Sequence, residues 1–174
     1  VGRSIEAQFP RRSAPVGDEL LRVENLTTTG TFEDISLSVH AGEVVGIAGL
    51  VGAGRTEVLR AIFGADPYES GRISVKGTAL PDDDVRAAIN AGLGLVPEDR
   101  KAQGLVLGGS VEENLGLAVL RRETRAGIVD RASLRQQARK SIDSLGIRTP
   151  SPAAIVRNLS GGNGQVALYG HAQG

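Results

Sequence analysis

The feature that most constrains the fold of this chain is a glycine-rich stretch, GLVGAGRTE, at residues 49–57. The residues just before it, 43–48, are nearly all apolar after the first, which predicts a central strand covered on both faces. After it, Val58, Leu59 and Ile62 fall on one face of a helix. A strand, a glycine loop and a helix in this order predict an α/β fold.

The same stretch matches the phosphate-loop pattern of Gly, four residues, Gly, a basic residue and Ser or Thr, with Arg55 in place of Lys. Its glycines let the backbone approach phosphate closely, and the helix that follows adds its positive N-terminal end. Thr56 would place its hydroxyl on Mg²⁺, while Arg55 would reach the β- and γ-phosphates. The candidate nucleotide-binding residues are Gly49, Val51, Gly52, Ala53, Gly54, Arg55, Thr56 and Glu57. The alternative is a glycine-rich turn that only packs a helix on a sheet.

Composition narrows the class of protein. A length of 174 residues supports one domain, and the formal net charge of zero points to neither nucleic acid nor anionic lipid as a partner. The absence of cysteine excludes disulfides and thiolate metal sites, so the cytosol is the expected compartment. No run approaches the roughly 18 apolar residues of a spanning helix. The chain also has no Met, so we expect Val1 not to be a natural start.

The N-terminal half predicts a linker followed by strands and helices. Residues 1–18 are rich in Pro, Arg and Gly and have little apolar periodicity, as in a linker. Alternating apolar residues at 21–26 and 35–39 predict two antiparallel outer strands. Residues 71–77 and 93–96 predict two further strands, and between them Asp82 is placed to cap a helix that runs to about Ala91. We expect the main domain to occupy residues 19–174.

The character of the sequence changes from about residue 108. Ser110 and Glu113 have the spacing of a capping box ahead of an apolar run, and a second helix is predicted from about Ala132 to Leu145. We expect residues of about 108–158 to form a helical subdomain without strands, inserted into the α/β unit.

A second motif, LSGG at residues 159–162, follows this helical stretch. Alone it is a serine-capped helix start, but after a phosphate loop it resembles the signature of ABC-transporter ATPases. In that family the signature binds the γ-phosphate of ATP held by an opposing cassette. The resemblance therefore implies that Ser160, Gly161 and Gly162 bind nucleotide across a dimer interface.

The stretch VPEDRKAQGLVLGGSVEENL, residues 96–115, narrows the resemblance. It is similar to the second cassette of ATP-binding subunits that import ribose, galactose, xylose and related sugars, which fuse two cassettes in one chain. This implies a truncated ABC-type nucleotide-binding domain with an antiparallel β subdomain and a helical subdomain. It also implies ATP and Mg²⁺ as cofactors, and a place at the inner face of the cell membrane. The implied partners are the first cassette or a second copy, transmembrane permease subunits and, indirectly, a sugar-binding protein.

Departures from the family pattern bear on activity. Arg55 replaces Lys, and Glu98 stands where most cassettes have a metal-sensing Gln, so Thr56 and Glu98 are the candidate metal ligands. The adenine-stacking aromatic would fall near Gly30, whereas Phe32 fits a core position better. The acidic catalytic residues of the family would lie beyond Gly174, so the catalytic residues are unknown and the fragment alone is expected to be inactive. The alternatives are a competent ATPase and a degenerate regulatory or structural cassette.

Overall fold

The computed structural model describes residues 16–120, 123–125 and 127–159. The chain divides into two compact units, Val1–Leu93 and Gly94–Gly174. Among the described residues, no helix is both long enough and apolar enough to cross a membrane.

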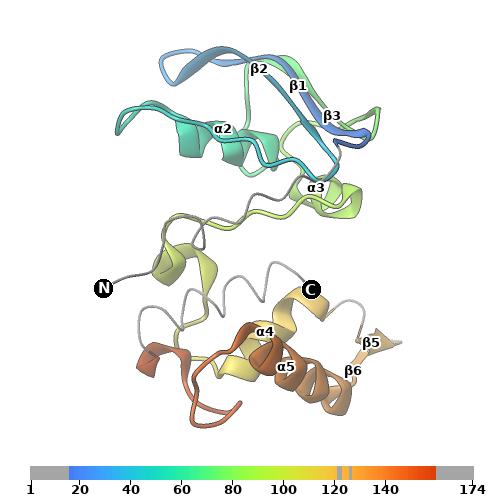
Figure 1. The fold of residues 1–174 in the computed structure, drawn as a ribbon, viewed down its shortest axis with the longest axis vertical. Coiled ribbons are helices and arrows are strands. Elements are labelled where there is room, and N and C mark those ends of the chain that lie inside the picture. Colours follow the sequence, from blue (N-terminus) through green and yellow to red (C-terminus); the bar gives the residue numbers. More distant parts are fainter. Residues whose placement is uncertain (1–15, 121–122, 126, 160–174) are drawn as a thin grey trace, which may run out of the picture. The chain divides into compact units, whose positions relative to one another are not determined.

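The first unit is built on an antiparallel sheet (Figure 1). Its strands are β1 (Glu19–Thr28), β2 (Phe32–His40), β3 (Ser70–Val75) and β4 (Thr78–Ala79), in the order β2-β1-β3-β4. Val23 of β1 pairs with Leu37 on one side and Ile73 on the other, so alternate apolar side chains gather on one face. The two predicted outer strands and the strand predicted at 71–77 are confirmed.

Helix α2 (Arg55–Ile62) covers the apolar face of this sheet (Figure 1). Val58, Ala61 and Ile62 are its buried residues, and they pack in one cluster with the sheet residues Val23, Leu26, Phe32 and Ile73. Leu26 is fully buried. The side chains predicted to share a helical face therefore do so, except that Leu59 is 45% exposed.

Helix α3 (Val85–Ala91) ends the first unit. Its cap is Asp84, whose Oδ1 accepts a hydrogen bond from the Ala87 amide at 2.9 Å, so the prediction of Asp82 as the cap was wrong by two residues. Asp82 instead accepts a hydrogen bond from the Tyr68 hydroxyl. The run of three aspartates offers several caps, and the register that the structure adopts buries Ala88.

The strands predicted at 43–48 and 93–96 are absent: both segments lack regular structure. Val44 is 96% exposed, and Val45 and Ile47 are each 39% exposed, so the first segment is not covered on both faces. A strand exists only where a neighbour completes its hydrogen-bonding ladder. Within the described part of the chain, no segment pairs with either of these two, which is why apolar composition alone gave the wrong prediction.

The second unit contains two main helices, α4 (Val111–Val119) and α5 (Arg131–Leu145), which pack against each other. Val111, Leu115 and Ala138 form a buried cluster with Ile147 and Val156. A π-helical turn, η1 (Arg100–Gly104), precedes them, and a short 3₁₀ helix, η2 (Val156–Asn158), follows. The helical character predicted for this region is confirmed.

One feature of the second unit differs from the prediction of a stretch without strands. Strands β5 (Thr124–Arg125) and β6 (Ile128–Val129) pair antiparallel between the two helices. Gly127, in the turn between them, has φ of 79°, the left-handed conformation that glycine adopts most easily. Strands of two residues are too short to produce a detectable alternation of apolar and polar residues.

Candidate functional site

The glycine-rich stretch forms an exposed loop directly before α2. Residues 50–53 make a turn in which the Ala53 amide donates to the Leu50 carbonyl at 3.1 Å. Leu50 is 85% exposed and Val51 99% exposed, so the tip of the loop projects away from the core. Gly52 and Gly54 have φ of 82° and 75°, both in the left-handed region that the phosphate-loop pattern requires of its glycines.

The start of α2 differs from the starts of the other α-helices in the described residues. Its N-cap is Gly54, which offers no side-chain acceptor to the first helical turn. Side-chain oxygens of Asp84, Ser110 and Asp130 accept hydrogen bonds from first-turn amides of α3, α4 and α5. A helix start without a side-chain acceptor presents its amides and positive end to an external anion such as phosphate.

Gly54 also fixes the loop against the turn between β1 and β2. A Cβ atom at this position would lie 2.5 Å from the Thr31 carbonyl oxygen, closer than any real side chain approaches. At the other end of the loop, a Cβ on Gly49 would lie 3.5 Å from Cδ of Arg55, so the aliphatic stem of Arg55 passes beside Gly49. Sequence reasoning missed Thr31, because nothing in the local pattern shows that this turn touches the loop.

The remaining loop residues are accessible to a ligand. Arg55 and Glu57 are exposed and Thr56 is half-buried in the first turn of α2. The Thr56 hydroxyl is a hard oxygen ligand of the kind that Mg²⁺ accepts, so it fits the predicted metal role. In the described ranges there is no group of three or more Asp, Glu, His or Cys that could hold a metal by itself. A Mg²⁺ ion here would therefore need phosphate oxygens and water as its other ligands.

The other predicted site residues lie outside this loop. Glu98 belongs to the second unit, where it is exposed in a bend just before η1. Its predicted sharing of a metal ion with Thr56 stays a prediction. Leu159, the first residue of the LSGG motif, packs against the apolar cluster of the second unit. Ser160, Gly161 and Gly162 lie outside the described residues, as does most of the predicted linker.

Two aromatic residues in the described part of the first unit are engaged in packing. Phe32 is 8% exposed and belongs to the core cluster, which agrees with its interpretation as a core residue. Tyr68 packs against the same cluster. Burial, with a smaller effect from the hydrogen bond to Asp82, raises the pKa of the Tyr68 hydroxyl to about 12.

The capping box predicted in the second unit is present. The Glu113 amide donates to Oγ of Ser110 at 3.1 Å, and Oε2 of Glu113 accepts from the Ser110 amide at 2.7 Å. The hydrogen bond from the Ser110 amide, with one from its hydroxyl, lowers the pKa of the Glu113 carboxyl. Nearby, the side chain of Asn114 is fully buried and bonds to both backbone groups of Val106, which ties the segment before α4 to this helix.

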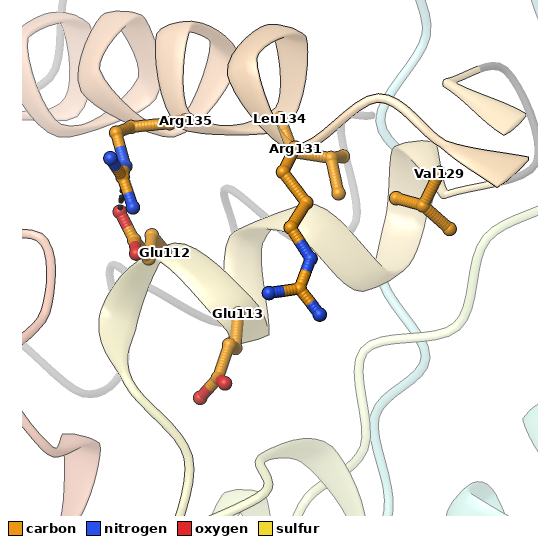
Figure 2. Close-up of a pocket in the computed structure, with 6 residues that line it drawn as sticks. All are labelled: Glu112, Glu113, Val129, Arg131, Leu134 and Arg135. Carbon is orange, nitrogen blue, oxygen red and sulfur yellow. Dashed lines mark hydrogen bonds and ion pairs between the residues drawn. The ribbon is translucent and has the colours of Figure 1, made fainter.

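A pocket of about 290 Å³ lies between the starts of α4 and α5 and strand β6 (Figure 2). Figure 2 shows Arg135 paired with Glu112, at 3.3 Å between Nε and Oε2, while Arg131 and Glu113 extend in the same direction beside them. Val129 and Leu134 supply its apolar wall. No residue of the predicted phosphate loop lines this pocket, so the pocket is not the predicted nucleotide-binding site.

Comparison with known proteins identifies close relatives. A family model described as ABC transporter matches residues 32–169. The ribose import ATP-binding protein RbsA 1 of Streptomyces avermitilis is 57% identical over 170 residues, covering 98% of this chain and 33% of its own length. The ribose import ATP-binding protein RbsA of Corynebacterium glutamicum is 55% identical over 170 residues, with coverage of 98% and 32%. The chain thus spans about a third of the length of these relatives.

Solved structures agree in fold. A dimeric post-hydrolysis state of an ATP-binding cassette bound to ADP and phosphate gives a TM-score of 0.72 at 19% identity, covering 88% of this chain and 68% of that one. The ADP conformation of another transporter cassette gives 0.68 at 21% identity, covering 88% and 64%. At these identities the likeness concerns the fold alone, and it confirms the predicted fold class.

Proposed function

Because this chain belongs to the ABC transporter family, we propose that it is the ATP-binding domain of a sugar importer and holds Mg-ATP at residues 49–57. The observation that carries this proposal is the start of α2. A left-handed glycine without a side-chain acceptor begins this helix, directly after an exposed loop with a second left-handed glycine at Gly52. This is the backbone arrangement that an anion cradle needs.

Each loop residue has a role in this proposal. Gly49, Gly52 and Gly54 keep the backbone free of side chains where phosphate approaches, and amides of the loop and of the first turn of α2 would line the cradle, apart from the Ala53 amide, which donates to the Leu50 carbonyl. The guanidinium of Arg55 binds the β- and γ-phosphates, for which its charge is suited although its planar fork is bulkier than the ammonium of Lys. Thr56 and Glu98 would hold Mg²⁺, which supplies charge neutralisation between the phosphates when bound.

The assembly follows from the same anion chemistry. We infer that Ser160, Gly161 and Gly162 of this domain bind the γ-phosphate held by an opposing cassette, either the first cassette of the same subunit or a second copy. Residues 1–18 would then be the linker between cassettes, and residues of about 108–158 the helical subdomain within the domain at 19–174. The ribose import relatives support ribose or a related sugar as the cargo, and permease subunits with a sugar-binding protein as partners at the inner membrane face.

The experiment that tests the proposal measures the binding of Mg-ATP to the full chain by calorimetry, with substitutions at Arg55. We expect Arg55→Ala to weaken binding by about tenfold or more, because a hydrogen bond to a charged group contributes roughly 1.5–3 kcal/mol. Arg55→Lys keeps the charge and should change the affinity by no more than about threefold.

Arg86→Ala is the matched control, because Arg86 is an exposed arginine on α3 of the same unit and outside the loop. It should leave the affinity unchanged. An Arg55→Ala variant that binds Mg-ATP as tightly as the parent would show that the loop is a structural turn, and would favour a degenerate cassette without nucleotide.

A further inference from the structure

Two β-bulges interrupt the hairpin that β1 and β2 form. Along the residue pairs of the two strands, β1 carries one extra residue before Leu26, and β2 carries one extra residue before Ile35, the partner of Leu26. The two register shifts cancel, so the hairpin closes at the pair Thr28 and Phe32. A bulge bends its strand and increases the local twist, so these two bulges set the direction in which the end of the hairpin points.

Four polar residues hold the two bulges together. The Asn25 amide donates to Oγ of Ser36 at 2.9 Å. In the opposite direction, the Asp34 amide donates to Oγ1 of Thr27 at 3.0 Å. The side chains of Asn25 and Asp34 also bond directly, from Nδ2 to Oδ1 at 2.5 Å. We refer to Asn25, Thr27, Asp34 and Ser36 as the polar clasp.

The clasp holds its two central residues in a strained conformation. Asn25 and Asp34 have φ of 49° and 53°, in the left-handed region that side chains disfavour, although Asn and Asp enter it more readily than most residues. Both are exposed, so neither side chain contributes to the core. The neighbouring strand β3 is adapted to the bend, because a Cβ on Gly71 would lie 2.6 Å from Cα of Leu26. Strain of this kind is retained where the geometry that it produces is used.

The end of this hairpin touches the predicted phosphate loop. The Thr31 amide donates to the Thr28 carbonyl at 3.0 Å and closes the turn. The Thr31 carbonyl oxygen lies 2.5 Å from the Cβ position of Gly54, and Cβ of Phe32 lies 3.6 Å from it. Asp34 closely follows these two contact residues in the chain. A change in the bend at the clasp would therefore move the backbone that supports Gly54.

We propose that Asn25 and Asp34 are positioning residues for the nucleotide site at residues 49–57. The clasp fixes the bend of the hairpin, the bend places the Thr31 carbonyl against Gly54, and this contact keeps the start of α2 open to phosphate. The inference rests on the proposed function, because it concerns the same loop. It adds residues that act on this loop from a neighbouring strand pair without touching the ligand.

The test compares Mg-ATP binding by the full chain with that of two variants of Asp34. Asp34→Gly tolerates the left-handed backbone but removes the clasp, and we expect it to weaken binding by about two- to 30-fold, the range for residues that act on a site through an intervening contact. Asp34→Asn removes the charge but keeps an oxygen that accepts from Asn25, and it should bind within about twofold of the parent. Equal weakening in both variants would assign the effect to charge and overturn the inference.

Lys76→Gly is the matched control. Lys76 also has a left-handed backbone, with φ of 50°, but it lies in the turn between β3 and β4, near the start of β1. The substitution therefore makes the same backbone change away from the clasp, and it should leave the affinity for Mg-ATP unchanged. Weakening as large as that in Asp34→Gly would mean that a flexible residue anywhere in the sheet has this effect, and would contradict the proposal.

A second measurement separates positioning from stability and needs no nucleotide. In the isotope-labelled chain, Asp34→Gly should shift the amide resonances of Thr31 and Gly54, whereas Asp34→Asn and Lys76→Gly should leave both near their parental positions. A clasp that only stabilises the fold would lower the urea midpoint of Asp34→Gly without moving the Gly54 resonance, and this result would overturn the inference. A parent chain that fails to bind Mg-ATP would overturn the proposed function, while the Gly54 resonance would still decide whether the clasp positions the loop.

Discussion

At the scale of single residues, Gly54 has two separate reasons to be glycine. Its φ of 75° is unfavourable for any residue with a side chain, and a Cβ atom would lie 2.5 Å from the Thr31 carbonyl oxygen. Gly52 shares only the first reason, because its φ is 82° but nothing lies within 4 Å of its Cβ position. Substitutions at Gly52 and Gly54 therefore distinguish the cost of backbone strain alone from the cost of strain together with a steric clash.

We predict that Gly52→Ala lowers the free energy of unfolding by about 1–2 kcal/mol, the cost of placing a side chain in the left-handed region. Gly54→Ala should cost more, because the Thr31 carbonyl must also move, and the affinity for Mg-ATP should fall with it. Urea denaturation of both variants, followed by calorimetry, measures the difference. Equal losses of unfolding free energy in the two variants would show that the turn between β1 and β2 moves aside at no energetic cost.

Tyr68 is a second residue with a measurable signature. Its pKa is raised from the ordinary 10.0 to about 12, chiefly by burial, so the folded state favours the neutral phenol. This contribution to stability is fully present below pH 10 and is lost as the pH rises toward 12. In a Tyr169→Phe variant, Tyr68 is the remaining tyrosine. We predict a tyrosinate absorbance midpoint near 12, and the loss of this transition in Tyr68→Phe.

The absorbance titration must be paired with unfolding experiments across the same pH range. Tyr68→Phe should make the free energy of unfolding less dependent on pH between 10 and 12. A midpoint for Tyr68 close to 10.0 would mean that the ring is hydrated in the folded protein.

At the scale of elements, α4 depends on its capping box. Ser110 is 7% exposed, and its Oγ accepts from the Glu113 amide at 3.1 Å. We predict that Ser110→Ala lowers the free energy of unfolding by about 1 kcal/mol, because a first-turn amide loses its acceptor. Ser144→Ala is the control, since that exposed serine on α5 only donates to the Ser141 carbonyl. Similar losses of unfolding free energy in both variants would contradict the claim that Ser110 stabilises α4 as its N-cap.

The capping box also shows which elements the sequence can predict. Ser110 and Glu113 are three residues apart, so their contact is local and was correctly predicted. The strands predicted at 43–48 and 93–96 depend on distant partners, which apolar composition does not reveal. In the loop, the glycine conformations were predictable from the motif, whereas the contact with Thr31 depends on tertiary packing.

At the scale of the whole molecule, the described residues form two apolar clusters with no member in common. Leu26 belongs to the cluster of the first unit and Val111 to that of the second, and both are fully buried. Each cluster is drawn from its own part of the chain. Substitutions in the two clusters therefore share no packing partner.

We predict that Leu26→Ala lowers the free energy of unfolding by about 2–5 kcal/mol, and Val111→Ala by less, because fewer methyl groups are removed. In the double variant the two losses should add to within about 0.5 kcal/mol, as they do for sites without shared contacts. Urea denaturation of the parent, both single variants and the double variant gives the coupling. A coupling of more than about 1 kcal/mol would mean that the two clusters stabilise each other.

The exposed segment before the phosphate loop carries a hazard for the chain while it folds. Residues 44–48, VVGIA, are uncharged, contain no proline and include three β-branched side chains, and Val44 is 96% exposed. Such short stretches readily stack between molecules in the cross-β arrangement that seeds fibrils. Glu43 on one side and Arg55 beyond the loop are the nearest charges that could discourage this stacking, as gatekeeper residues do. Newly made chains would thus risk coaggregation through the sequence that leads into their proposed nucleotide site.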